Sequence, residues 1–442
     1  MSIIAETLAE AGIVGAGGAG FPTHVKLSGK ADTVVINGAE CEPLLHKDKE
    51  LIVHYGDSVV EGLARAMDLT GARRGVIGIK RKYTRVIDSI RPKLRPGMEI
   101  GPLDDVYPSG DEFILIWQTL GRVIPPGAIP LAVGAVVMNV ETAYNVARAG
   151  TFPVIEKFVS VAGAVKNPCS VRVPLGASMS VCLAAAGGAT IDDPAFIIGG
   201  AMMGFLAENL NQPVTKTTGG IIVLPRDHFI VQRKSWDWNK TKRVARSACD
   251  QCSHCTELCP RYLLGHPIEP AKSMRSVGFS GTGRAEVPAT VFCSECNLCS
   301  YCSCPEGLDP KGVNVENKRR ILAEKSRMEN PPFHPERAAR LMAIRQTPTK
   351  RLMRRIGLDR FVNQGELLEN AVETASVELL LKQHIGTPLT PMVAVGQAVR
   401  RGEKIAARPV TDGKPALGAD LHASIDGQVV AVTDKSIRIE KR

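Results

Sequence analysis

The sequence lacks the features of a membrane or secreted protein. Its longest apolar stretches, residues 128–140 and 196–206, fall short of the roughly 18 residues that a membrane-spanning helix needs, and Pro, Gly or Asn interrupts them. The first residues, MSIIAETLAEAGIVG, carry two acids and no cationic cluster, which argues against a secretion signal. Aromatic residues make up only 5% of the chain and do not alternate with basic ones. We therefore expect a cytoplasmic protein with no membrane insertion and no nucleic acid partner.

The cysteines are abundant and unevenly placed. Nine of the twelve lie between Cys249 and Cys304 in a chain of 442 residues, which is long enough for about two to four domains. Disulfide frameworks are typical of small secreted chains, whereas crowded thiols at short fixed spacings in a long chain indicate metal ligands. The cysteine-rich region is therefore predicted to bind metal, either as iron–sulfur clusters or as a structural zinc site.

Two cysteine runs predict a pair of [4Fe–4S] clusters. The first run has the bacterial ferredoxin spacing and ends in Cys259-Pro260. The second run departs from that spacing after its third cysteine, so either Cys302 or Cys304 is the fourth ligand, and the proline after Cys304 favours Cys304. In two-cluster ferredoxins the fourth cysteine of each run binds the other cluster. The predicted ligand sets are Cys249, Cys252, Cys255 and Cys304 for one cluster, and Cys293, Cys296, Cys299 and Cys259 for the other.

A glycine-rich loop near the N-terminus predicts a second kind of site. Residues 12–24 read GIVGAGGAGFPTH, and Lys26 follows. Such a loop lets backbone N–H groups approach a phosphate or a flat ring. The next apolar strand, residues 33–36, runs into the acidic turn NGAECEP at 37–43, and open α/β sheets bind ligands at the carboxyl ends of their strands.

The order of four segments resembles a known flavoprotein family. GAGGAGFPT at 15–23, NGAECEP at 37–43, YPSGDE at 107–112 and VMNVET at 137–142 resemble the flavin- and NADH-binding subunit of respiratory complex I, and more closely the NADH-oxidising subunit of the Rnf complex. The resemblance implies FMN contacts from Gly15, Gly17, Gly18, Gly20, Lys26, Asn37, Tyr107, Asp111, Asn139 and Thr142. It also implies catalytic roles beside the flavin and nicotinamide for Glu40, Glu42 and Glu112. Ala39 and Asp111 depart from the complex I pattern, which has Asp and Glu there.

The remaining segments predict a multidomain α/β protein. Strands and a short helix after residue 158 resemble the β-grasp (SLBB) domain of the same flavoproteins, and the short strands after residue 376 resemble the barrel-sandwich module of the Rnf subunit. The turn at 424–427 has no lysine, so lipoylation is not expected. The predicted units are a Rossmann-like FMN/NADH domain at 1–157, the β-grasp domain at 158–230, a helical two-cluster domain at 231–330, a basic helical linker at 331–375 and the barrel-sandwich domain at 376–442.

This arrangement resembles the cobalamin reductases of propanediol-utilisation bacterial microcompartments. The resemblance implies that electrons pass from NADH through FMN and the clusters to cobalamin, which is reduced from Co(III) to Co(II) or Co(I). It also implies a microcompartment location, with a corrinoid adenosyltransferase and shell or lumen proteins as partners. Two alternatives remain open: an Rnf-like NADH dehydrogenase subunit with a ferredoxin or membrane partner, and an iron–sulfur relay protein without flavin.

The positive charge of the chain is concentrated around the cysteines. Residues 231–360 contain 24 Lys and Arg against 13 Asp and Glu, a net charge of +11, while the whole chain carries +10. The helices predicted at 310–325 and 335–357 contribute much of this charge. Either these are solvated helix faces, or the region docks an acidic electron-transfer partner.

Overall fold

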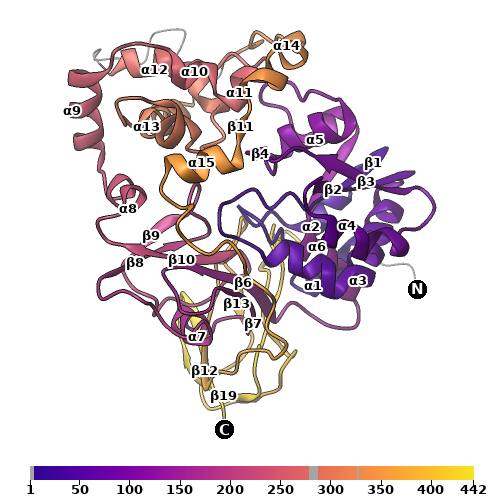
Figure 1. The fold of residues 1–442 in the computed structure, drawn as a ribbon. Helices are drawn as coiled ribbons and strands as arrows, with labels where there is room; N and C mark the ends of the chain where they lie inside the picture. The colour runs from indigo at the N-terminus through magenta and orange to yellow at the C-terminus, as the bar shows by residue number, and fades with distance from the viewer. Residues whose placement is uncertain (1–3, 278–286, 326–327) are drawn as a thin grey trace.

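The computed structural model describes residues 4–277, 287–325 and 328–442. The predicted 231–330 unit includes residues 278–286 and 326–327, and the predicted 1–157 unit includes residues 1–3, so those parts of the predictions lie outside the described residues. Figure 1 shows four modules: an α/β domain, a central mixed sheet, a helical region and a β-rich C-terminal module. The predicted multidomain α/β fold is confirmed. Within the described residues no helix has the length and apolarity to cross a membrane.

A parallel sheet forms the core of the N-terminal domain, in the order β3-β2-β1-β5. Its strands are β1 (Thr33–Asn37), β2 (Arg74–Lys80), β3 (Met98–Leu103) and β5 (Ala135–Asn139). Its helices are α1 (Ala5–Glu10), α2 (Thr23–Leu27), α3 (Lys47–Thr70), α4 (Thr84–Ile90), η1 (Arg91–Lys93), α5 (Glu112–Leu120), η2 (Pro130–Val133) and α6 (Val140–Arg148). Nearly continuous burial of β1 and β5 is what a parallel sheet covered on both faces requires.

Two contacts fix the geometry of this domain at its ligand-binding edge. Helices α3 and α6 approach so closely that a Cβ atom on Gly62 would lie 1.9 Å from the carbonyl oxygen of Ala143, which only glycine allows. Strands β1 and β5 pair in register, so that Asn37 lies opposite Asn139 at their carboxyl ends. The polar turns that follow the two strands therefore meet at one edge of the sheet.

The second module has the β-grasp arrangement, with strand order β7-β6-β10-β8-β9 and a parallel β6–β10 pair at its centre. Its elements are β6 (Glu156–Gly163), β7 (Cys169–Pro174), α7 (Met179–Ala185), β8 (Pro194–Ile198), β9 (Phe205–Ala207) and β10 (Gly220–Pro225). Residues 366–372 add backbone hydrogen bonds along β7, which bring the chain back past this sheet to the C-terminal module.

The region that contains the two cysteine runs is helical, and the helices between the cysteines are short because Gly, Pro and Cys are closely spaced there. They are α8 (Phe229–Lys234), α9 (Trp238–Ala248), α10 (His254–Glu257), α11 (Pro260–Leu263), α12 (Pro270–Ser276), η3 (Pro288–Phe292), η4 (Cys299–Ser303), α13 (Pro310–Ala323), α14 (Glu336–Arg345) and α15 (Thr349–Arg355). Figure 1 places these helices above the β-grasp sheet and beside the N-terminal domain.

The helix predicted at 335–357 is wrong as a single element. The chain forms α14 and α15 with the short strand β11 (Thr347–Pro348) between them. Pro348 provides no backbone N–H and disfavours a helical residue before it, so the helix stops there. Strand β11 pairs with β4 (Val106–Tyr107) of the N-terminal domain, which ties the helical region to that domain.

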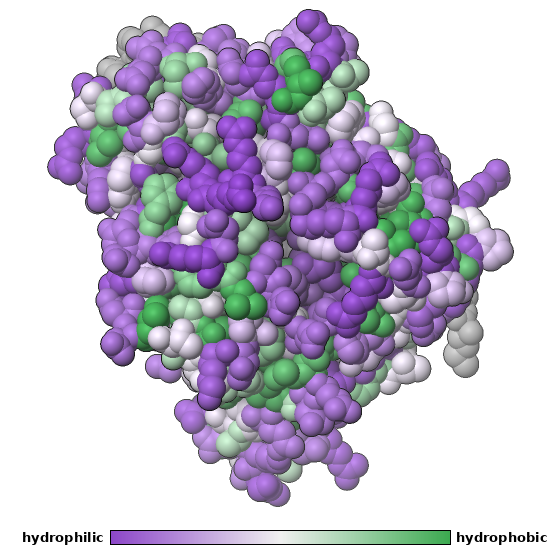
Figure 2. Space-filling model, in the orientation of Figure 1, coloured by the Kyte–Doolittle hydropathy of each residue, from purple (hydrophilic) through white to green (hydrophobic). Residues whose placement is uncertain are grey.

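The C-terminal module contains two small antiparallel sheets, ordered β12-β20-β19-β14 and β13-β15-β18, and a β16–β17 hairpin. Its strands are β12 (Ser376–Leu380), β13 (Thr390–Pro391), β14 (Ala398–Val399), β15 (Lys404–Ala407), β16 (Val410–Thr411), β17 (Lys414–Pro415), β18 (Leu421–His422), β19 (Gly427–Val432) and β20 (Ser436–Glu440). The face of the molecule in Figure 2 is mostly hydrophilic, and its hydrophobic residues lie in small separate groups.

Candidate functional site

A cavity of about 980 Å³ opens at the carboxyl edge of the parallel sheet, between the N-terminal domain and the β-grasp module. Its size is in the range of small-molecule and cofactor sites. The structure brings all of the predicted flavin-site residues to its walls: Gly15, Gly17, Gly18, Gly20, Lys26, Asn37, Glu40, Glu42, Tyr107, Asp111, Glu112, Asn139 and Thr142. Residues that are far apart in the sequence thus surround one space, as the order of the four segments predicted.

Side chains from two other elements hold the glycine loop in place. Gly18 and Gly20 have backbone φ values of 88° and 68°, which residues other than glycine rarely adopt. The Ala16 N–H donates to the Thr142 hydroxyl across 2.9 Å, and the Ala16 carbonyl accepts from the Lys157 ammonium across 3.2 Å. The side chains of Thr142 and Lys157 therefore hold the glycine loop through the backbone of Ala16.

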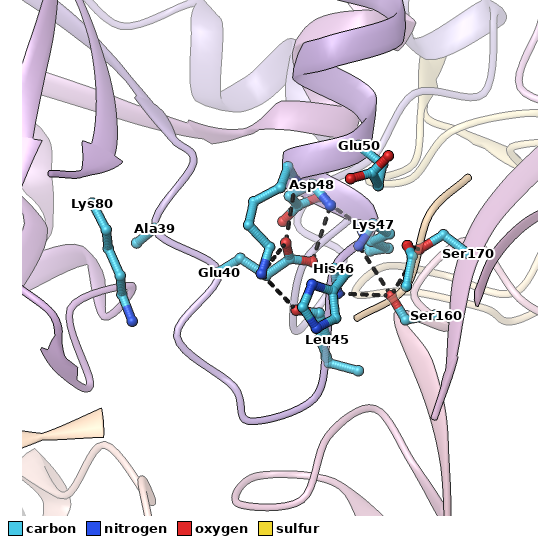
Figure 3. A network of polar contacts seen from close by, with 12 residues as sticks. Ala39, Glu40, Leu45, His46, Lys47, Asp48, Glu50, Lys80, Ser160 and Ser170 are labelled. Carbon is cyan, nitrogen blue, oxygen red and sulfur yellow. Dashed lines mark hydrogen bonds and ion pairs between the residues drawn. The ribbon is translucent and has the colours of Figure 1, made fainter. Parts of the chain in front are cut away.

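Glu40 organises the start of helix α3, as Figure 3 shows. Its carboxylate accepts hydrogen bonds from the backbone N–H groups of Asp48 and Lys49, across 3.0 and 3.1 Å. This satisfies amides that a helix N-terminus leaves free. Burial raises the pKa of Glu40, although the nearby Lys49 ammonium opposes the shift. The carboxylate predicted to be catalytic thus has a local structural role as well as a position on the cavity wall.

A chain of buried charges lies beside Glu40 and beneath the glycine loop. The Glu141 carboxylate accepts from the Lys157 and Lys47 ammonium groups across 2.5 and 3.0 Å, and Lys47 also lies 2.7 Å from Asp48. Asn139 donates to Asp48 across 2.7 Å. Burial lowers the pKa of Lys157 to about 8, against the opposing effect of Glu141. Lys47 and Asp48 line the cavity, although neither was among the predicted site residues.

Glu42 connects the N-terminal domain to the β-grasp module. Its carboxylate accepts from the N–H groups of Met202 and Met203 across 2.9 and 2.8 Å. Burial raises its pKa, and these two hydrogen bonds oppose the shift. The β-grasp module therefore forms part of the cavity wall, with Gly199, Met203, Phe205, Thr215, Thr217 and Thr218 among its lining residues.

Two further ion pairs position acidic residues at the cavity. The Lys26 ammonium lies 2.8 Å from the Glu112 carboxylate and also donates to the Val137 carbonyl across 2.8 Å. Asp111 caps helix α5 by accepting from the Phe113 N–H, and it lies 2.6 Å from the Arg261 guanidinium of α11. Glu112 is therefore paired within the cavity, and Asp111 joins the cavity to the cysteine-rich helices.

The cavity wall reaches the second cysteine run. Cys296 lines the cavity, and its carbonyl oxygen accepts a 2.7 Å hydrogen bond from the Tyr107 hydroxyl. Burial raises the pKa of Tyr107 well above its usual value, so the phenol is protonated and donates. The sequence predicted a flavin contact for Tyr107, but no signal in it indicated that Tyr107 also holds the cysteine loop.

The residues of the cavity fit a flavin nucleotide. The hydroxyl of Thr23 is buried at the cavity wall and has no hydrogen-bond partner among the described residues, as expected of a group that serves a ligand. The glycine loop brings backbone N–H groups to the same space, which suits a phosphate or a flat ring. Lys26 adds a positive charge nearby.

The eight predicted cluster ligands fall into two groups of neighbours. Burial raises the pKa of Cys255 to about 12, and the nearby thiols of Cys304, Cys252 and Cys249 raise it further. Burial likewise raises the pKa of Cys299, with added effects from Cys296, Cys293, Cys259 and, least, Cys255. Cys304 is thus a neighbour of the first cysteine run and Cys259 a neighbour of the second, as the crossed ligand sets require, and the binding of two clusters by these sets stays a prediction.

Cys302 stands apart from both groups. Burial raises its pKa, and the charges that oppose the shift are those of Arg351 and Arg355. The pKa values of Cys255, Cys299 and Cys304, by contrast, are each raised further by other thiols of their predicted sets. Within the described residues no three His, Cys, Asp or Glu side chains form a site for a single metal ion. A cluster of four irons is a larger group, and four thiolates spread around it are what such a cluster needs.

The fold and these two kinds of site define a flavin- and iron–sulfur-containing oxidoreductase. Family models match the chain in the same order: the Nuo51 FMN-binding domain at residues 8–148, the SLBB domain at 158–206, the 4Fe-4S dicluster domain at 248–309 and the RnfC barrel sandwich hybrid domain at 361–441.

The chain belongs to the family of the cobalamin reductase PduS. It is 44% identical to cobalamin reductase PduS of Salmonella typhimurium over 99% of this chain and 96% of that protein, and equally similar to the PduS of Citrobacter freundii. It is also 35% identical to a component of the Na(+)-translocating ferredoxin:NAD(+) oxidoreductase complex of Acetobacterium woodii, over 59% of this chain and 58% of that component.

Proposed function

We propose that this protein takes electrons from NADH and delivers them to cobalamin, reducing the cobalt from Co(III) to Co(II) or Co(I). The observation that carries the proposal is the direct contact between the two sites: Cys296 belongs to a cysteine run and lines the cavity that fits a flavin. The near full-length similarity to cobalamin reductases supports cobalamin as the acceptor.

When bound, FMN accepts hydride from NADH, and [4Fe–4S] clusters exchange single electrons. The chain supplies the binding and the orientation. The glycine loop, fixed by Thr142 and Lys157, offers N–H groups, and Lys26 offers a positive charge at the cavity. Phe205 is exposed at 57% although it lines the cavity, so its ring is free to stack on an entering ligand.

Among the three glutamates predicted to be catalytic, Glu112 is the one whose carboxylate is most accessible to such a ligand. Its side chain is 40% exposed and is held by one ion pair with Lys26. The carboxylates of Glu40 and Glu42 each accept two backbone N–H groups, so their roles are to shape the acidic turn and to fix the opposite wall. A microcompartment location, with an adenosyltransferase and shell or lumen proteins as partners, remains part of the proposal because the relatives are PduS proteins.

The experiment is to purify the protein anaerobically, to count iron, sulfide and flavin per chain, and to follow cob(III)alamin reduction with NADH. We expect both cofactors and NADH-dependent cobalamin reduction. Rapid reduction of artificial acceptors without reduction of cobalamin would overturn the choice of acceptor. Absence of flavin from the purified protein's spectrum would instead favour a relay protein.

An Rnf-like role is the second candidate, because the similarity to a component of an ion-translocating complex covers more than half of the chain. It predicts transfer to ferredoxin and co-purification with membrane subunits. Reduction of cobalamin by the isolated chain, without transfer to ferredoxin, would exclude it.

A further inference from the structure

We propose that the two thiol sets have different places in the electron path. The inner set, Cys259, Cys293, Cys296 and Cys299, receives electrons at the flavin cavity, and the outer set, Cys249, Cys252, Cys255 and Cys304, releases them at the protein surface. This inference rests on the proposed function for the direction of flow, but the placement of the two sets is tested without it.

The inner set touches the cavity and is fixed from two sides. Cys296 is part of the cavity wall, and the Tyr107 hydroxyl of the N-terminal domain holds its carbonyl. The next residue, Asn297, donates to the Met202 carbonyl of the β-grasp module across 2.6 Å. Both Tyr107 and Asn297 are at most 5% exposed, and Asn297 has a φ of 64°, so the loop is held in an uncommon conformation.

The two sets meet inside the protein. Cys255 of the outer set and Cys299 of the inner set pack with Ala271 in a small buried cluster. Thr256, which follows Cys255, accepts from the Ala271 N–H across 2.9 Å and so fixes helix α10 against α12. The two sets therefore approach each other inside the protein, at a place that is shielded from solvent.

The outer set reaches the surface. Cys252 is exposed, and Cys249 and Cys304 are half-buried. In the inner set Cys259, Cys296 and Cys299 are buried, and the carbonyl of half-buried Cys293 accepts from the Lys318 ammonium. An acceptor that meets the protein from solvent therefore approaches the outer set first.

Two arginine side chains lie beside Cys304 of the outer set. The Arg355 guanidinium donates to the Cys304 carbonyl across 3.2 Å. Burial lowers the pKa of Arg233, and the nearby Cys304 thiol is one of the groups that oppose the shift, so Arg233 also lies close to this set.

Each transfer moves one electron, oxidising the group on the inner set and reducing the group on the outer set. No bond forms or breaks, and NADH is the source of the electrons.

The test uses the native protein without NADH or cobalamin. The anaerobic holoprotein is exposed to a limiting amount of ferricyanide with a chelator, the free thiols are alkylated with iodoacetamide, and each cysteine is read by mass spectrometry. We expect Cys249, Cys252, Cys255 and Cys304 to become labelled together as about half of the iron is lost. Labelling of the inner set first, or of all eight in parallel, would overturn the proposal.

Buried Cys169 and Cys182 are internal controls, because they lie in the β-grasp module and react only if the chain unfolds. A second measurement compares Cys252→Ser with Cys296→Ser after treatment with NADH or with dithionite. We expect NADH to reduce the remaining cluster in Cys252→Ser but not in Cys296→Ser, whereas dithionite reduces it in both. If NADH reduces neither the variants nor the native protein while the labelling order holds, the proposed function fails and the placement stands.

Discussion

The Tyr107 hydroxyl donates a 2.7 Å hydrogen bond to the carbonyl oxygen of Cys296, joining residues 189 positions apart in the chain. Tyr107 belongs to the flavin cavity and Cys296 to the second cysteine run, so this bond fixes the position of the cysteine loop relative to the cavity. Strand β11 pairs with the strand that contains Tyr107 and strengthens the same junction.

Tyr107→Phe is expected to weaken this junction. The substitution leaves the buried Cys296 carbonyl without its donor, which costs about 1–3 kcal/mol of unfolding free energy. We expect a lower Tm and a changed EPR spectrum for one of two clusters, with flavin retained. Tyr55→Phe is the matched control, since the Tyr55 ring packs on Tyr144 and Phe158 in another part of the domain. Equal effects of the two substitutions would contradict the role of the Tyr107 hydrogen bond.

Lys157→Met is expected to release the glycine loop. It removes a buried cation from Glu141 and a donor from the Ala16 carbonyl, and breaking such a pair costs roughly 3 kcal/mol or more. The purified variant should hold less FMN, measured by absorbance per chain, and should unfold at a lower temperature. Lys166→Met, at an exposed lysine of the same module, should change neither quantity. Full flavin content in Lys157→Met would show that the loop needs no such support.

Cys304→Ser and Cys302→Ser separate the two candidates for the fourth ligand. The Cys304 thiol lies among Cys252 and Cys249, whereas Cys302 lies near Arg351 and Arg355. We expect Cys304→Ser to lose or alter one cluster, with the iron content per chain falling by up to about half. Cys302→Ser should keep the iron content of the native protein. Iron and sulfide analysis after anaerobic purification measures this, and loss of iron in Cys302→Ser alone would reverse the assignment.

His422 is expected to make stability depend on pH. Burial lowers the pKa of His422 from an ordinary value of 6.5 to about 4. Between these two pH values the histidine is protonated in the unfolded chain but neutral in the native one. The free energy of unfolding therefore falls by roughly 1 kcal/mol per pH unit between pH 6.5 and 4, and is independent of this group above pH 6.5.

His422→Gln should flatten the dependence of Tm on pH between 7 and 5, measured by thermal unfolding. His54→Gln, at a half-exposed position on α3, is the comparison variant for the loss of a histidine. An unchanged slope in His422→Gln would show that the histidine is protonated without cost in the native protein.

The sequence predicted best those features that depend on local spacing. The glycine loop encodes its geometry within a few residues, and its glycines line the cavity together with residues of the other three segments that resemble the flavoprotein family. The cysteine runs likewise predict two ligand sets from their spacing, and that assignment stays a prediction. The interruption at Pro348 was also readable, because proline ends a helix, but the prediction of one helix at 335–357 overlooked it.

Long-range pairings were not accessible in this way. Lys47 and Glu141 are 94 positions apart, and their contact exists only because α3 and α6 pack closely where Gly62 meets Ala143. The run of charges after Leu45 was a usable signal, since buried charges at a helix start need partners. The contribution of the β-grasp loop at 199–205 to the cavity had no comparable signal, because it depends on how two modules are placed.

Mixing the reduced protein with cobalamin is the decisive measurement for the proposed electron path. The anaerobic holoprotein is first reduced with NADH, freed of excess nucleotide, and then mixed with cob(III)alamin in a stopped-flow spectrophotometer. We predict that the flavin and the iron–sulfur absorbance return to the oxidised state as cob(II)alamin forms in matching amount. Protein that stays reduced in the presence of cobalamin, yet is oxidised at once by an artificial dye, would contradict this path.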